Sequence, residues 1–140
     1  MASALVSYTQ YTHFIFALLT ARPSVANHTL AVYTTSQTVG IMRGEVNFHS
    51  GHTLRVFEQI DFVAHRIRYY SYEVIYQGEK LWWHDPMPHP HIPELQSSHP
   101  HHKHVPPDIK HHRIPAPDLS FEEPNLPFLI AEIETSVEVS

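Results

Sequence analysis

The sequence predicts an α+β domain: an antiparallel four- to five-stranded sheet with an N-terminal helix, an extended His/Pro-rich segment and a short C-terminal helix. Three observations support this prediction. Apolar residues recur at helical spacing over residues 3–20. Residues 28–85 contain β-rich segments joined by short turns. After residue 84 the composition shifts to proline and histidine. A chain of 140 residues, 42% of them hydrophobic, is long enough to bury one core.

The N-terminal helix is predicted over residues 3–20, where Leu5, Tyr8 and Ile15 lie three or seven residues apart. It ends before Arg22-Pro23, because the residue preceding a proline disfavours helical conformation.

Five strands are predicted after this helix, and the short turns between most of them make neighbours antiparallel. They cover residues 29–36, 40–48, 53–62, 66–76 and 80–84. The third alternates most clearly, with Leu54, Val56, Glu58 and Ile60 expected on one face.

The His/Pro-rich segment contains eleven of the 12 prolines and nine of the 14 histidines, all between His84 and Pro127. Proline lacks an N–H and interrupts strand pairing, so we expect neither a helix nor a central strand here. The predicted organisation is therefore an α+β core over residues 1–85, an extended segment laid over it at 86–124, and a C-terminal helix with an acidic tail at 125–140, all within one domain. Asn125 is the expected N-cap of that last helix.

Several functional classes are excluded or disfavoured by composition. The chain has no cysteine, which excludes disulfides, thiolate nucleophiles and cysteine-bound metals. Residues 1–20 contain no lysine or arginine, and the apolar run at 14–19 is too short to cross a membrane, so we expect a cytoplasmic protein without a membrane partner. No glycine-rich phosphate-binding loop is present.

Histidines two residues apart recur in the segment, and in an extended chain such residues point to the same side. The pairs are His89 with His91, His99 with His101, and His102 with His104. A pair of this kind can bind zinc or nickel, with Asp85 or Asp108 adding a carboxylate. The favoured prediction is no cofactor, because a solvated histidine-rich loop also binds metal adventitiously. If a metal is present, the predicted ligands are His89, His91, His101 and His104.

The stretch "HHKH" at residues 101–104 also suits proton transfer. Metal-free RNA cleavage needs a base for the 2′-hydroxyl, an acid for the leaving 5′-oxygen and a cation for the developing charge. We predict His102 and His104 as the acid and base, and Lys103 as a phosphate-binding cation. Glu58 and Tyr72 are predicted to assist, although Glu58 also fits an ordinary exposed sheet position.

Basic and aromatic residues interleave on the predicted strand 66–76, as they do on sheets that bind RNA. Arg66, Arg68 and Tyr70 are the predicted nucleic-acid contacts, with Arg68, Tyr70 and Tyr72 sharing one face. The alternative is that the tyrosines belong to the core and the arginines are only solvated. A proline-rich strip that docks a protein partner is a further possibility.

The order of these parts resembles the TumE-like family of bacterial toxin–antitoxin toxins. The resemblance covers roughly residues 28–115 and rests on "HSGHTLRVFE", "RYYSY", "WWHD" and, most specifically, "PHHKH" at 100–104. The chain departs from the expected family pattern at His84-Asp85-Pro86 and at Glu73-Val74. The resemblance implies a small toxin neutralised by a cognate antitoxin, and leaves its oligomeric state open.

The favoured functional hypothesis is therefore a toxin that acts on RNA as a metal-independent endoribonuclease. RNA as the target follows from the histidine chemistry and not from the resemblance. The alternatives are a non-enzymatic His-rich metal-binding protein and a module that binds protein or RNA.

Overall fold

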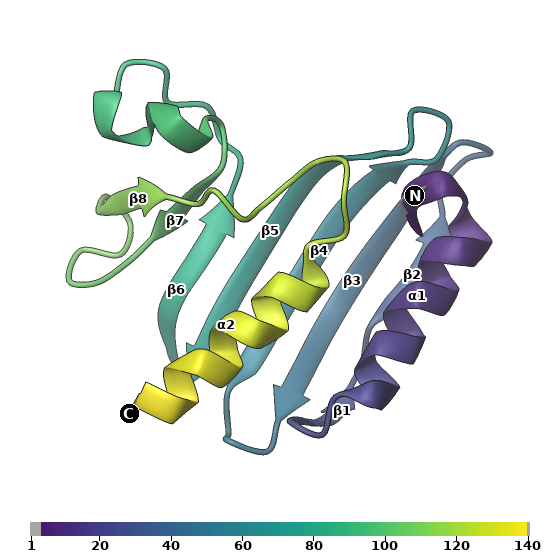
Figure 1. The fold of residues 1–140 in the computed structure, drawn as a ribbon, viewed down its shortest axis with the longest axis horizontal. Helices are drawn as coiled ribbons and strands as arrows, with labels where there is room; N and C mark the ends of the chain where they lie inside the picture. The colour runs from purple at the N-terminus through teal and green to yellow at the C-terminus, as the bar shows by residue number, and fades with distance from the viewer. Residues whose placement is uncertain (1–3, 140) are drawn as a thin grey trace.

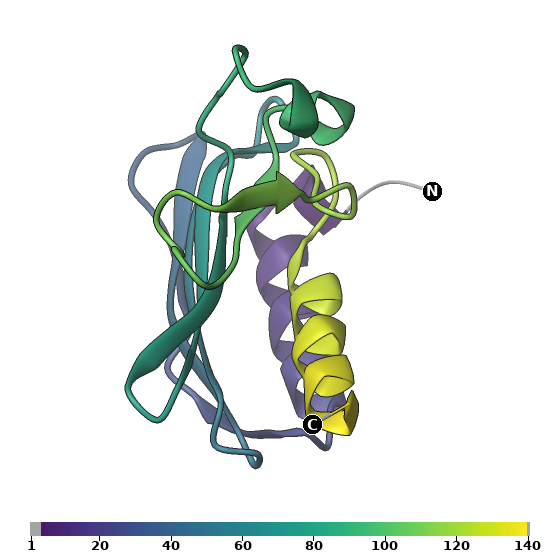
Figure 2. The same ribbon diagram turned by 90° about the vertical axis from the view of Figure 1, so that its left-hand side faces the viewer.

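The computed structural model describes residues 4–139, which form one antiparallel sheet with both long helices on the same face (Figures 1 and 2). The helices are the 3-10 turn η1 (Ala4–Val6), α1 (Tyr8–Ala21), the 3-10 helix η2 (Pro93–Ser98) and α2 (Leu126–Val139). The strands are β1 (Val25–His28), β2 (Ala31–Thr34), β3 (Val39–Phe48), β4 (Thr53–Asp61), β5 (Arg66–Tyr76), β6 (Glu79–Asp85), β7 (His102–His104) and β8 (Arg113–Pro115).

The predicted α+β class with an N-terminal and a C-terminal helix is confirmed, but the predicted number of strands is wrong. The described residues form eight strands in the order β1-β3-β4-β5-β6-β7-β8, with β2 also paired to β3. The strand predicted at 29–36 is present as the shorter β2, whereas β1 lies before that range, where no strand was predicted. Both short strands pair with the long β3. Two further strands come from the His/Pro-rich segment.

Helix α1 begins at Tyr8 because the side chain of Ser7 accepts a hydrogen bond from the backbone N–H of Gln10. The predicted start at residue 3 lies outside the described residues. The predicted end is nearly correct, since the helix stops at Ala21 and Arg22 is its C-cap.

The central strands have one face under the helices and one face open, which we call the helix face and the open face (Figure 2). The predicted alternation in β4 is confirmed on the helix face, where Leu54, Val56, Glu58 and Ile60 are all buried. Residues on the open face, such as Arg55, are more exposed.

A bulge in β5 changes the faces that the sequence predicts. Gln59 of β4 pairs with Tyr69, but Ile60 pairs with Ile67, so Arg68 is an extra residue. Ile67 and Tyr70 are therefore both buried on the helix face, while Arg68 and Tyr69 are exposed. The expectation that Arg68 shares a face with Tyr70 and Tyr72 is wrong for this reason.

The His/Pro-rich segment extends the sheet at its edge instead of lying across a face (Figure 1). Strand β7 pairs with β6 on one side and with β8 on the other, so three residues of the segment do occupy an interior strand. The prediction of no central strand is wrong here because residues 102–104 contain no proline and can pair on both sides. Pro100 and Pro106 flank this strand without interrupting its ladder.

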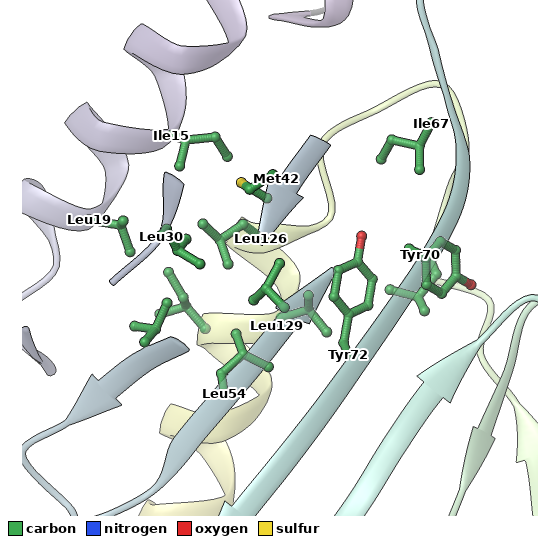
Figure 3. Close-up of a cluster of buried hydrophobic side chains, with 14 of the residues drawn as sticks. Ile15, Leu19, Leu30, Met42, Leu54, Ile67, Tyr70, Tyr72, Leu126 and Leu129 are labelled. Atoms are coloured by element: carbon green, nitrogen blue, oxygen red, sulfur yellow. The ribbon is translucent and has the colours of Figure 1, made fainter. Parts of the chain in front are cut away.

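The core lies between the helix face and the two helices (Figure 3). Ile15 of α1 and Leu129 of α2 are fully buried against sheet residues such as Met42 and Leu54. No helix of the described residues is long and apolar enough to cross a membrane.

Glu58 is a carboxylate inside this core, held by hydrogen bonds from two other elements. The hydroxyls of Tyr11 and Tyr72 each donate to one of its oxygens at 2.5 Å, and the Asn125 amide donates to the Tyr72 hydroxyl at 3.0 Å. Burial raises the pKa of Glu58 to about 7, although the two tyrosine hydrogen bonds oppose that rise. The network joins α1, β4, β5 and the start of α2.

The raised pKa of Glu58 predicts that this residue makes the fold less stable as pH rises. In the folded protein Glu58 keeps its proton up to about pH 7, whereas in the unfolded chain it loses the proton near its ordinary pKa of 4.5. The stability that Glu58 contributes is therefore fully present below about pH 4.5 and is lost as the pH rises to 7. The difference amounts to roughly 3 kcal/mol. Glu58→Gln should remove this component, as measured by urea unfolding at pH 5 and pH 8. Glu45→Gln, on the more exposed ion pair with Arg55, should retain the wild-type pH dependence. Equal pH dependence in wild type and Glu58→Gln would contradict the prediction.

Candidate functional site

The pairing of β6 with β7 brings two histidines next to an aspartate. Asp85 lies opposite His102 and Trp83 lies opposite His104 in the antiparallel ladder. Alternate residues of these strands contact Glu132 of α2 on the helix face. Asp85, His102 and His104 therefore lie on the open face.

These three side chains form the Asp85/His102/His104 cluster. The Nε2 atoms of His102 and His104 are 3.2 Å apart. His102 Nε2 lies 3.1 Å from Asp85 Oδ1, and His104 Nε2 lies 3.1 Å from Asp85 Oδ2. Both imidazoles are almost completely buried, whereas the Asp85 side chain is 17% exposed. Access to the cluster is therefore from the aspartate side.

Each side chain of the cluster is held by a further hydrogen bond. His102 Nδ1 lies 3.1 Å from the Pro100 carbonyl, and His104 Nδ1 lies 3.0 Å from the Ile109 carbonyl. Asp85 accepts from the Trp83 indole N–H at 3.2 Å and from the Met87 backbone N–H at 2.9 Å. The Trp83 ring also stacks on His104, with centroids 4.1 Å apart. The orientation of all three groups is thus set by their surroundings.

Asp85 is ionised at any physiological pH. Burial by itself would raise the pKa of its carboxyl, but the close contacts with His102 and His104 and the hydrogen bond from the Met87 backbone N–H outweigh burial and hold the pKa well below its usual range. The cluster therefore carries a fixed negative charge beside two imidazoles.

Arg113 and His89 lie next to the cluster. Arg113 of β8 is paired with His104 in the ladder, so the two side chains emerge on the same face. Its Nε atom is buried and has no hydrogen-bond partner among the described residues. The His89 ring meets the His102 ring edge-on, with centroids 5.0 Å apart. A positive group with a spare donor thus stands beside the cluster.

The open face continues from the cluster across the sheet with aromatic and basic side chains. Tyr69 is 39% exposed and lies 6.2 Å from the half-buried Phe57 ring, centroid to centroid. Arg43 is exposed and pairs with Phe57 across the ladder, and Arg55 lies along the same strand. Neither long helix covers this surface (Figure 2). It offers rings for stacking and cations for phosphate groups.

The structure unites only part of the predicted catalytic set. His102 and His104 are together, but Lys103 points to the opposite face, where its Nζ lies 3.0 Å from Glu132 and 4.7 Å from the centroid of Trp82. Glu58 and Tyr72 are enclosed in the core on that same face. These three residues do not reach the cluster because strand alternation separates them from it.

The predicted nucleic-acid residues are also divided. Tyr70 is fully buried, stacks on Tyr72 at 4.7 Å and hydrogen-bonds to His101 at 2.6 Å. Its ring is therefore not available for stacking with a base. Arg66 lies over the Phe121 ring at 5.2 Å, and Arg68 is exposed at the bulge.

The metal ligands predicted from sequence do not converge as a set. His104 is in the cluster and His89 contacts His102, while His91 contacts His89 with ring centroids 6.1 Å apart. His101 instead packs against Tyr70 and Phe121. The described residues contain one group of three or more potential ligands within metal-binding range, and that group is Asp85, His102 and His104.

Sequence reasoning did not identify Trp83 as a site residue, and it named Asp85 only as an optional metal ligand. The positions of these two residues and of Arg113 follow from the register of β6, β7 and β8. The available signal was the pair of histidines two residues apart within a proline-free triplet. That signal predicts a shared face but not the strand beside it.

Comparison with known proteins agrees with the sequence motifs. A family model described as toxin TumE matches residues 15–137, a range that includes the whole cluster. No curated protein and no solved structure gives a match.

The position of Lys103 predicts a structural effect when its charge is removed. Lys103→Met keeps the side-chain stem over Trp82 but leaves Glu132 with one cationic partner fewer. The unfolding free energy measured with urea should fall by about 1 kcal/mol. Lys110→Met, at an exposed position of the same segment, should change it by less than about 0.5 kcal/mol. Equal values for the two variants would contradict the structural role of Lys103.

Proposed function

The chain belongs to the TumE toxin family, and we propose that it acts by cleaving RNA at the Asp85/His102/His104 cluster. Membership of a toxin family implies a cognate antitoxin as its protein partner. The proposal rests on the position of the cluster. It lies at the end of the open face of the sheet, and that face bears aromatic and basic residues. An RNA target also places the site of action in the cytoplasm.

The open face suits single-stranded RNA better than a duplex. Splayed bases stack on exposed rings, and sheets use such rings to hold single strands. Tyr69 and Phe57 offer these rings beside one another. Arg43 and the exposed Arg68 can neutralise phosphates along the bound strand. Tyr69 and Phe57 therefore take the base-stacking role that was predicted for Tyr70.

The proposed reaction is attack of a ribose 2′-oxygen on the adjacent phosphorus. The new bond joins the 2′-oxygen to phosphorus while the bond from phosphorus to the 5′-oxygen breaks. The cluster takes the proton of the 2′-hydroxyl, and the 5′-oxygen leaves with a proton from solvent water on the opposite side of the phosphate. The products are a 2′,3′-cyclic phosphate and a 5′-hydroxyl. Arg113 stands where it can offset the charge that develops on the phosphate oxygens.

The geometry argues against His102 and His104 as a separate base and acid, which the metal-independent mechanism assumed. The attacking and leaving oxygens lie on opposite sides of phosphorus. The two Nε2 atoms are only 3.2 Å apart and face the same carboxylate. They therefore act on one side of the phosphate as a single unit.

Cleavage predicts a defined dependence on the 2′-hydroxyl and on the two histidines. Purified protein should cut a single-stranded RNA oligonucleotide, and a single 2′-deoxy substitution at the cut position should block that cut. His102→Ala and His104→Ala should each lower the rate by about 100-fold or more. His112→Ala, at an exposed position outside the cluster, should cleave like wild type. The readout is gel analysis of the fragments and their termini.

The same variants should be tested in cells, with expression under tight control and the antitoxin present or absent. Wild type and His112→Ala should arrest growth only without the antitoxin, and the cluster variants should not. Growth arrest by folded His102→Ala and His104→Ala, or wild-type protein that arrests growth but leaves RNA intact, would refute the proposal.

A further inference from the structure

The tautomers of His102 and His104 follow from their hydrogen-bond partners. A backbone carbonyl can only accept, so the Nδ1 atom that faces it in each ring must carry the proton. In the neutral imidazole this leaves the lone pair on Nε2. Both lone pairs then point toward each other and toward Asp85.

In this arrangement no hydrogen is available for the contacts among the two Nε2 atoms and the Asp85 carboxylate. With both histidines neutral, two lone pairs and a carboxylate meet at 3.1–3.2 Å with no hydrogen between them. One charged imidazole would supply a single hydrogen and leave the other lone pair facing the carboxylate, and two charged imidazoles would place two cations 3.2 Å apart in a buried site. One bound cation satisfies both lone pairs and the carboxylate together.

We propose that Asp85, His102 and His104 bind a divalent transition-metal ion of the zinc type. The ligands are the two imidazole Nε2 atoms and the Asp85 carboxylate, whose two oxygens each face one histidine. This set suits zinc and does not suit magnesium or calcium. The geometry of these three side chains supports the metal site whether or not the protein cleaves RNA.

The spacing of the ligand atoms matches such an ion. Bonds of about 2.0–2.1 Å at tetrahedral angles separate ligand atoms by about 3.3 Å, and right angles separate them by about 2.9 Å. The observed separations fall between these values: 3.2 Å between the two Nε2 atoms, and 3.1 Å from each Nε2 to its own oxygen of Asp85. An ion can therefore enter with small side-chain adjustments.

The surrounding hydrogen bonds are those expected around metal ligands. Each histidine donates its second ring N–H to a carbonyl, and the aspartate accepts from Trp83 and Met87. Such contacts fix the ligand tautomers and orientations before the ion arrives. They are also the independent sign that distinguishes this cluster from exposed pairs such as His111 and Asp108.

Three protein ligands leave at least one coordination position open, as in catalytic zinc sites. The more exposed Asp85 is the accessible side of the cluster, and Arg113 lies beside His104. If the protein cleaves RNA, the ion would supply a Lewis acid near Arg113, and water at the open coordination position would take the proton of the 2′-hydroxyl in place of the two Nε2 atoms. The proposed site differs from the ligand set predicted from sequence, and it implies a bound metal where the sequence favoured no cofactor.

Metal binding can be measured without any activity assay. Protein purified without a metal-affinity column and stripped with a chelator is titrated with zinc chloride by calorimetry. Wild type should bind about one equivalent and gain several degrees in Tm. Asp85→Asn, His102→Ala and His104→Ala should each lower the affinity at least about tenfold. The matched controls His111→Ala and His112→Ala alter exposed histidines of the same segment and should bind like wild type.

Replacement of zinc by cobalt provides a second readout that is insensitive to losses of stability. The visible absorption of bound Co²⁺ should report nitrogen and oxygen ligands in wild type and should disappear in Asp85→Asn. The proposal would be overturned if wild type bound neither ion, or if all three cluster variants bound both ions as tightly as wild type.

Binding of zinc by a protein that leaves RNA intact would refute only the proposed function. RNA cleavage by chelator-treated protein that fails to bind zinc would refute only the metal site.

Discussion

The candidate site depends on the register between β6 and β7. Because side chains alternate along a strand, Asp85 opposite His102 puts both histidines of "HKH" on the open face and the lysine on the helix face. A slip of one residue would turn Lys103 outward and both histidines toward α2. Contacts on both faces oppose that slip. Glu132 of α2 lies 3.0 Å from Lys103 on one side, and Asp85 lies 3.1 Å from each histidine on the other.

The two faces of the sheet divide structural and functional roles. On the helix face, Glu58 and Glu132 bind partners from several elements, and each joins helix to sheet. These contacts explain why carboxylates occur under the helices without forming an accessible site. The open face bears the cluster and Tyr69, and neither long helix lies over that side of the sheet (Figure 2). A large molecule can therefore approach the sheet from this side without displacing a helix.

The sequence predicted those features that depend on local periodicity and missed those that depend on register. The alternation of β4 and the end of α1 were predictable because each depends on residues a few positions apart. The bulge at Arg68 has no clear sequence signal, and it separates Arg68 from the face that Tyr70 and Tyr72 share. The shared face of His102 and His104 was predictable from their spacing. Asp85 lies 17 positions before His102, and only the folded ladder brings the two together. Asn125 was correctly placed at the start of α2, yet its side chain bonds Ser120 and Tyr72.

The tautomers of His102 and His104 give the most direct test of this account, because both follow from the β7 register and the carbonyls behind it. Long-range ¹H–¹⁵N correlation spectra of metal-free protein at neutral pH distinguish a protonated Nδ1 from a protonated Nε2. The account predicts that both rings carry the proton on Nδ1, and that the Nε2 shifts change when zinc is added. Rings that average between tautomers as solvent-exposed histidines do, or that are protonated on Nε2 alone, would contradict it.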